Sequence, residues 1–131
     1  VYFLTQKCLP HLNKGGRIIN ISTGTTRFSN AGYSVYASMK AAVEVFTKYL
    51  AKELGAKGIS ANVVAPGPVE TDFNNGNVRD NQQLKGVLSN LSPLGRVGNA
   101  NDIGPVVAFL CSPEASWING QRIEVSGGIN G

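Results

Sequence analysis

The chain has 131 residues, of which 42% are hydrophobic and 15% are charged. That balance supports one packed core and excludes an intrinsically disordered chain. The net charge is +4 with the basic residues scattered, so we expect no nucleic-acid partner. The chain shows neither a transmembrane run nor a signal peptide, so we expect a cytoplasmic protein without a membrane partner. Its two cysteines, Cys8 and Cys111, form no CxxC pair, which predicts free thiols and no metal site.

The first segments predict a helix followed by a strand. Helical spacing over residues 1–13 places four apolar residues on one face: Val1, Leu4, Cys8 and Leu12. Gly15 and Gly16 are expected to end this helix. The run RIINIS at residues 17–22 is rich in β-branched side chains, which is typical of a strand buried on both faces.

A long helix and a second strand follow. Residues 23–32 are polar and predict a loop, after which helical spacing returns from Ser34 to Leu54. The apolar stripe of this helix is Val43, Phe46, Leu50 and Leu54. Residues 59–67, ISANVVAPG, predict a second buried strand that ends at its Pro-Gly pair. Residues 68–80 are rich in asparagine and glycine and predict a loop.

The last part of the chain predicts two helices and a strand. A weak helix is expected at residues 81–91 and a stronger one at residues 99–112, where Asn99 can cap the first turn. The apolar face of that stronger helix is Ile103, Val106, Val107 and Leu110. Residues 121–128, QRIEVSGG, predict the last strand, and we expect Trp117 to cover the core beside it.

Alternating helices and strands of these lengths predict an α/β fold with a parallel sheet covered on both faces. Ligands of such sheets bind beyond the carboxyl ends of the strands. The predicted ends are Ser22-Thr23-Gly24, Ala65-Pro66-Gly67 and Ser126-Gly127-Gly128. A binding site is therefore expected where the first two of these ends meet the start of the long helix.

Tyr36 and Lys40 stand four positions apart near the start of the long helix, so they project from the same face. A free tyrosine ionises at a pKa of about 10, and a neighbouring ammonium favours its phenolate. A tyrosine–lysine pair can therefore exchange a proton near neutral pH. By itself the spacing is weak, because such pairs occur by chance on many exposed helices.

Further segments surround this pair at ordered intervals. Asn20-Ile21-Ser22-Thr23 ends the first predicted strand, and Pro66-Gly67-Pro68-Val69-Glu70-Thr71 ends the second. With Tyr36-Ala37-Ser38-Met39-Lys40 and the stretch PLGRVGNANDI at residues 93–103, the sequence resembles the short-chain dehydrogenase/reductase family of the classical type. That family carries N-x-S-S, Y-x-x-x-K and P-G-x-x-x-T in this order, and the resemblance covers essentially the whole chain.

The resemblance implies an oxidoreductase that transfers hydride between NAD or NADP and a carbonyl compound or secondary alcohol. Tyr36 would be its acid–base group, Lys40 would favour the ionised phenol and hold the nicotinamide ribose, and Thr23 would hydrogen-bond the substrate oxygen. Four more residues would line the nicotinamide together with Tyr36 and Lys40: Pro66, Gly67, Val69 and Thr71. The family resemblance also implies a homodimer or homotetramer, and a lid-like segment at residues 72–91 that sets substrate choice.

The hydroxyl group at the end of the first strand departs from the family pattern, because threonine stands where the family has a catalytic serine. Thr23 lies thirteen residues before Tyr36, as the family pattern requires. Ser22 is the alternative, but neighbouring side chains on a strand point to opposite faces, so both cannot face the substrate. A third interpretation makes Thr23 an ordinary loop threonine bonded to nearby backbone.

The glycine-rich T-G-x-x-x-G-x-G turn and the N-N-A-G strand end of the family do not occur in this sequence, and neither does its relay asparagine. The resemblance therefore implies that residues 1–131 are the carboxyl-terminal half of one Rossmann-type domain, a doubly wound parallel sheet. By itself this half should bind nicotinamide cofactor poorly and be inactive. The alternative function is a catalytically silent paralogue or fragment that acts as a binding or assembly module.

Overall fold

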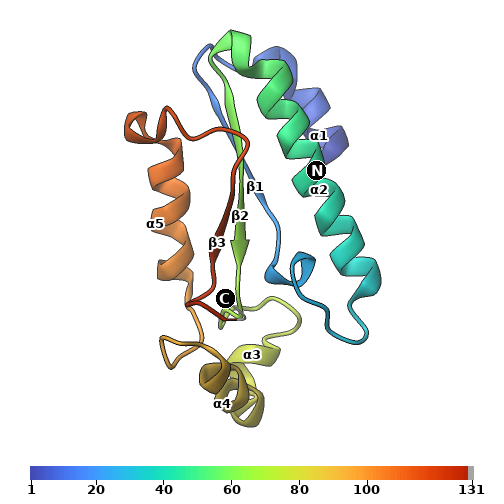
Figure 1. Ribbon diagram of the computed structural model, residues 1–131, viewed down its shortest axis with the longest axis vertical. Helices are drawn as coiled ribbons and strands as arrows, with labels where there is room; N and C mark the ends of the chain where they lie inside the picture. The colour runs from blue at the N-terminus through green and yellow to red at the C-terminus, as the bar shows by residue number, and fades with distance from the viewer. Residues whose placement is uncertain (130–131) are drawn as a thin grey trace.

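The computed structural model describes residues 1–129 and has one parallel sheet of three strands in the order β1-β2-β3 (Figure 1). The strands are β1 (Arg17–Ile21), β2 (Ser60–Pro66) and β3 (Arg122–Val125). Asn20 of β1 lies opposite Val63, and Val64 of β2 lies opposite Ile123. The α/β fold with a parallel sheet, as part of a doubly wound Rossmann-type architecture, is therefore confirmed.

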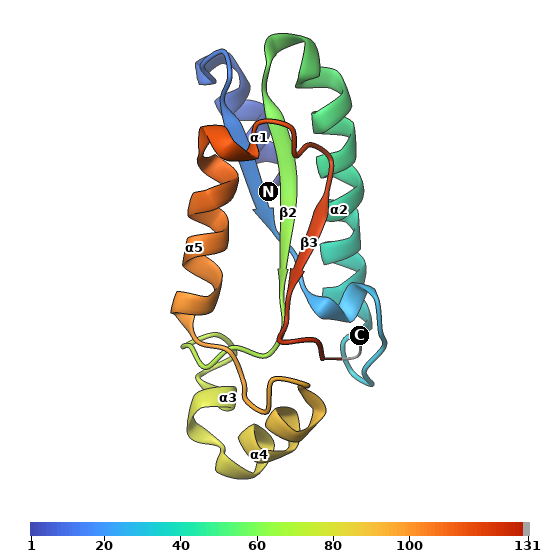
Figure 2. The same cartoon turned by 60° about the vertical axis from the view of Figure 1, so that its left-hand side comes forward.

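Helices cover both faces of the sheet. The helices are α1 (Tyr2–Cys8), α2 (Ser34–Leu54), α3 (Asn77–Asp80), α4 (Gln82–Leu91) and α5 (Ala100–Cys111). Figure 2 shows the sheet between α2 and α5, and α3 and α4 beyond the carboxyl ends of the strands, whereas Figure 1 shows α1 beside α2. This places the predicted site and the predicted lid at the same end of the molecule.

The core consists of two clusters, one on each face of the sheet. The cluster under α2 contains Leu50, Ala51, Leu54, Ile59 and Ala61. The cluster under α5 contains Val64, Leu110 and Ala115. Ile18 packs against the first cluster and Ile19 against the second, which follows from the alternation of side chains along a strand. The carboxyl end of β1 is less covered, because Ile21 is 42% exposed.

The two longer helices of the second half begin as the sequence indicates. Asn81 accepts a hydrogen bond from the backbone N–H of Leu84 at the start of α4. At α5, Asn99 accepts from the N–H of Asn101, and the Asp102 carboxylate accepts from the N–H of Asn99. Such a capping box satisfies N–H groups that have no partner inside the helix.

The helix predicted over residues 1–13 is shorter in the structure. The α-helix ends at Cys8, and a 3₁₀ turn follows at Leu9–His11. Pro10 explains the difference, because proline has no N–H to donate to an α-helical carbonyl. The predicted apolar face is only partly confirmed: Leu12 packs against the core, together with Leu9, which was not predicted. Val1, Leu4 and Cys8 are exposed instead.

Two expectations about the end of the chain are wrong as well. The last strand ends at Val125 rather than at residue 128, because Gly127 and Gly128 adopt φ angles of 66° and 83° that an extended strand does not have. Trp117 does not cover the core, since it is 98% exposed.

The loop predicted at residues 68–80 contains the short helix α3.

Within residues 1–129, no helix combines the length and apolar character needed to cross a membrane. In the same part of the chain, His, Cys, Asp and Glu side chains form no group of three or more that could hold a metal ion.

Candidate active site

A cavity of about 500 Å³ opens at the carboxyl ends of β1 and β2. All seven residues that the sequence analysis assigned to the site line it: Thr23, Tyr36, Lys40, Pro66, Gly67, Val69 and Thr71. They come from the end of β1, the first turns of α2 and the segment after β2. The structure thus brings together residues that lie up to 48 positions apart in the sequence, from Thr23 to Thr71.

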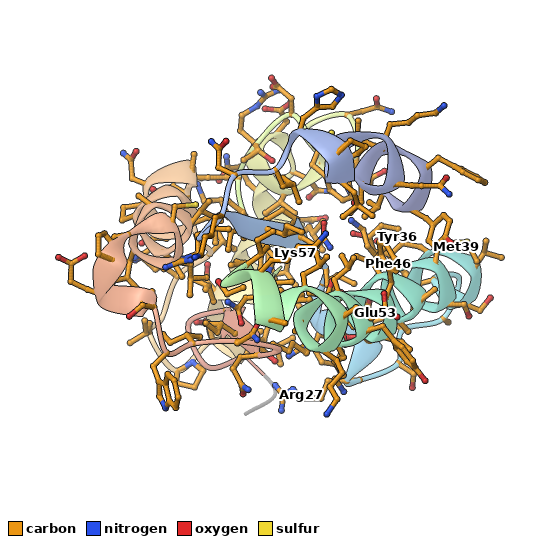
Figure 3. The ribbon with its side chains drawn as sticks, turned by 90° about the horizontal axis from the view of Figure 1, so that it is seen from above. Arg27, Tyr36, Met39, Phe46, Glu53 and Lys57 are labelled. Carbon is orange, nitrogen blue, oxygen red and sulfur yellow. The ribbon has the colours of Figure 1, made fainter. Side chains whose placement is uncertain are left out.

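Tyr36 and Lys40 project from the same face of α2. The ammonium Nζ of Lys40 lies 5.8 Å from the centroid of the Tyr36 ring, and it donates a hydrogen bond of 2.9 Å to the carbonyl oxygen of Ile21. That bond ties the lysine to the end of β1 and fixes its position relative to the tyrosine. Figure 3 shows Tyr36 and Phe46 on the side of α2 that faces α1.

Ser22 and Thr23 face different surroundings, as strand alternation requires. The Ser22 hydroxyl is buried and donates a hydrogen bond of 2.5 Å to the carboxylate of Glu44. The Thr23 hydroxyl oxygen accepts from the N–H of Thr25 at 3.4 Å, and the hydroxyl of Thr25 lies 3.3 Å away. These contacts are local and long, so the Thr23 hydroxyl remains the more available of the two for a ligand.

The segment after β2 lines the cavity mainly with backbone and small side chains. Gly67 is required there, because a Cβ at this position would lie 2.7 Å from the Cα of Ser126. Its N–H donates to the carbonyl of Val125 at 3.0 Å. Val69 is paired with Gly98 through an isolated parallel bridge. The chain therefore leaves the sheet along a fixed path, which presents Val69 and Thr71 to the cavity.

The cavity is also lined by Ser22, the alternative to Thr23, and by five residues that the sequence did not assign to the site: Ile21, Phe73, Ala100, Ile103 and Gly104. Phe73 is the most informative of these, because its ring centroid lies 6.1 Å from that of Tyr36. Ile103 was predicted to face the core; it packs against the α5 cluster and also reaches the cavity.

A network of charged side chains stands behind the end of β1. The Arg122 guanidinium pairs with Glu44 at 3.0 Å and with Glu124 at 2.9 Å, and it donates to the carbonyl of Thr23 at 3.0 Å. Burial raises the pKa of Glu44, but hydrogen bonds from Ser22, a neighbouring threonine and Arg122 outweigh it, and the net pKa lies below the ordinary 4.5. The network joins β1, α2 and β3 around the turn that carries Thr23.

Three ion pairs among the described residues involve the segment of residues 72–91. Arg79 pairs with Asp72 and Asp80, and Lys85 pairs with Glu70. Figure 1 shows the helices of this segment, α3 and α4, beyond the ends of the strands. Of this segment, Phe73 is the residue that lines the cavity.

Comparison with known proteins identifies relatives over most of the chain. The family model described as enoyl-(acyl carrier protein) reductase matches residues 1–130. An NADPH-dependent aldehyde reductase-like protein of Arabidopsis thaliana is 47% identical over 115 residues, which is 87% of this chain and 42% of that protein. The 3-oxoacyl-[acyl-carrier-protein] reductase FabG of Haemophilus influenzae is 44% identical over 131 residues, 98% of this chain and 53% of that protein.

Solved structures of two reductases are also similar to this chain. The promiscuous reductase LugOII of lugdunomycin biosynthesis has a TM-score of 0.90 at 38% identity, covering 98% of this chain and 50% of that chain. The angucycline C-6 ketoreductase LanV with bound NADP has a TM-score of 0.90 at 36% identity, covering 98% and 49%. The chain spans about half the length of these relatives. From its fold, its strand-end motifs and these matches, the chain belongs to the short-chain dehydrogenase/reductase family.

Proposed function

We propose that the complete protein is an NAD(P)-dependent oxidoreductase that transfers hydride between nicotinamide and a carbonyl compound or secondary alcohol. The observation that carries this proposal is the convergence of Tyr36, Lys40 and Thr23 on one cavity. Proton transfer to a carbonyl oxygen needs a positioned acid, and reduction also needs donors that stabilise the developing negative charge. The three side chains can supply both.

The cavity fits part of a nicotinamide cofactor. Its volume of about 500 Å³ lies in the range of small-molecule sites. Gly67 presents no side chain, and the ammonium of Lys40 can donate to ribose hydroxyls while it keeps its bond to Ile21. The residues that would hold the nicotinamide and its ribose are Tyr36, Lys40, Pro66, Gly67, Val69 and Thr71. When bound, the cofactor supplies or accepts the hydride.

In this proposal, residues of this chain bind and protonate the carbonyl oxygen of the substrate. The Tyr36 hydroxyl donates its proton to the carbonyl oxygen during reduction, and the Lys40 ammonium nearby stabilises the phenolate that remains. The Thr23 hydroxyl donates a hydrogen bond to the same oxygen and holds it in position. Val69 and Ile103 exclude water from this side of the cavity. In the direction of alcohol oxidation, the Tyr36 phenolate accepts the proton.

The relatives support this function and its cofactor. The Arabidopsis thaliana relative is named as NADPH-dependent, and the LanV structure holds NADP. We further propose that the complete protein works in the cytoplasm as a homodimer or homotetramer. The exposed free thiols of Cys8 and Cys111 fit a reducing compartment, and the exposed apolar side chains of Phe3 and Leu4 on α1 fit a subunit contact.

The test is an activity assay on the complete protein. It is incubated with NADPH or NADH and a panel of ketones and aldehydes, and loss of reduced nicotinamide is followed by absorbance. We expect turnover of at least one carbonyl compound. Cofactor binding without any turnover would contradict the proposal and favour the alternative, a silent paralogue that acts as a binding or assembly module.

A further inference from the structure

Three aromatic rings lie close together at the cavity, and two of them, Tyr36 and Phe73, line it. Tyr36 is the middle one: its ring centroid lies 6.2 Å from that of Tyr33 and 6.1 Å from that of Phe73. These separations are in the range of favourable edge-to-face and tilted aromatic pairs. The outer rings come from different segments, Tyr33 from the turn before α2 and Phe73 from the segment after β2.

Phe73 has an unusual environment for a large apolar side chain. It lines the cavity, yet it is 67% exposed. A ring in this position gains free energy when a ligand covers it. Among the described residues that line the cavity, Lys40 is the only one with a charged side chain, and the neighbouring walls include Val69 and Ile103. Phe73, Val69 and Ile103 therefore give the cavity an apolar part, which suits an apolar group of a ligand.

The backbone around Phe73 holds the ring in place. Its N–H donates to the hydroxyl of Thr71 at 3.3 Å. The next residues, Asn74, Asn75 and Gly76, all adopt positive φ angles, of 53°, 56° and 71°. Asparagine and glycine tolerate this left-handed region better than other residues. The turn therefore reverses the chain directly after Phe73 and leaves its ring at the cavity.

We propose that the open face of Phe73, beside the Tyr33–Tyr36 pair, binds an aromatic ring of the substrate, so that the complete protein prefers carbonyl compounds that carry such a ring over those with the same carbon skeleton and a saturated ring. This inference rests on the proposed function, because it names the substrate class of the same site. The aromatic ring takes no part in the reaction. It packs against the ring of Phe73, and this contact orients the substrate so that its carbonyl oxygen reaches the Tyr36 hydroxyl.

The test compares two ketones with the same bicyclic skeleton, β-tetralone and β-decalone. In both, the carbonyl group is not conjugated with a ring, so they differ mainly in whether the far ring is aromatic. The quantity measured on the complete protein is the ratio of kcat/KM for β-tetralone to kcat/KM for β-decalone. We expect a ratio well above one, and we expect Phe73→Leu to lower it by about threefold to tenfold.

Two control variants isolate the role of the ring. Phe73→Tyr keeps the aromatic face and should keep the ratio. Phe109→Leu makes the same change on α5 at a side chain that is 48% exposed and does not line the cavity, and it should also leave the ratio unchanged. Because Phe73 is largely exposed, its substitution should not unfold the protein, which a thermal melt of each variant checks.

The outcomes separate the two proposals. Reduction of both ketones with the same ratio in the wild type and in Phe73→Leu overturns the aromatic-ring inference and leaves the oxidoreductase function standing. Failure to reduce any carbonyl compound overturns the proposed function, and this inference with it. A ratio that falls in Phe73→Leu but not in Phe73→Tyr or Phe109→Leu supports both.

Discussion

Thr23, Tyr36 and Lys40 lie near the end of β1 and the start of α2 and line the cavity, whereas residues 72–91 form short helices and turns of which only Phe73 lines it. The first region is connected by contacts that reach across the whole fold, such as the pair between Arg122 and Glu44. The second is connected mainly by pairs between sequence neighbours. The fold thus fixes the positions of the proposed catalytic side chains. Local interactions, in contrast, hold the segment that is proposed to contact the substrate.

Burial separates the two kinds of ion pair. The side chains of Arg122 and Glu44 are 20% and 15% exposed, while those of Arg79 and Asp72 are 47% and 95% exposed. Exposed pairs contribute little to stability and are screened by salt. Substitutions in the first region should therefore change turnover or stability, and those in the second should change mainly how substrate binds.

Apart from loss of the Tyr36 hydroxyl, the largest effect is expected for Thr23→Val in the complete protein. Valine has nearly the same shape, so this change removes the hydroxyl and little else. Turnover should fall about 100-fold, as it does when one donor to a developing oxyanion is lost, while cofactor binding is kept. Ser22→Ala is the matched control; its hydroxyl is bonded to Glu44, and turnover should stay within about threefold. The reverse pattern would assign the role to Ser22.

A large loss of stability is expected for Arg122→Met. Glu44 and Glu124 would lose their shared cation in a partly buried place, which should cost about 2 kcal/mol of the free energy of unfolding, less than in a fully buried pair. Urea denaturation measures this. Arg27→Met, which removes a more exposed partner of Glu124, should cost below about 1 kcal/mol. If both variants lost the same free energy of unfolding, the Arg122 network would contribute no more to stability than an exposed ion pair.

A smaller effect is expected from acid. Burial raises the pKa of Glu44 and of Glu124. Hydrogen bonds and the neighbouring arginine side chains lower both pKa values by more, so that both lie below 4.5. Carboxylates with a lowered pKa stabilise the fold above the ordinary value, and this contribution is lost as the pH falls through the lowered pKa. The stability difference between the wild type and Arg122→Met should thus be constant above about pH 5 and shrink below it. A difference that stays constant in acid would contradict this origin.

The smallest effect is expected for Arg79→Met. Its pairs with Asp72 and Asp80 are exposed, so the midpoint of urea unfolding should not move. The KM of the preferred ketone should rise by less than about threefold, and the rise should vanish at high salt. Arg79→Lys keeps the charge and serves as the control. A fall in kcat instead would show that this segment positions the reacting groups.

The sequence predicts well those features that depend on spacing along one element. Tyr36 and Lys40 are four apart on a helix, and Asn99 begins α5 where its side chain can cap it. The parallel sheet follows from the order of helices and strands. The assignment of Thr23, Pro66, Gly67, Val69 and Thr71 to one site came from the family resemblance, and the structure places all of them on the same cavity.

Features that depend on distant contacts were not predictable in this way. Arg122 meets Glu44 across 78 positions of sequence, and no periodic pattern marks such a pair. Phe73 was assigned only to the lid-like segment, because a single aromatic residue in a polar loop gives no direction. The first helix was predicted too long, since helical spacing was followed past Pro10. Trp117 was expected in the core on hydrophobicity alone, although large aromatic residues also occur at surfaces.

The most direct measurement is hydride transfer in a single turnover by the complete protein, with Tyr36→Phe compared to Tyr33→Phe. Both variants remove one phenolic hydroxyl and keep the ring. We expect Tyr36→Phe to slow the chemical step by about 100-fold to 10,000-fold with cofactor binding unchanged, and Tyr33→Phe to retain most of the rate. Equal rates in the wild type and Tyr36→Phe would contradict the assignment of Tyr36 as the acid of this family member.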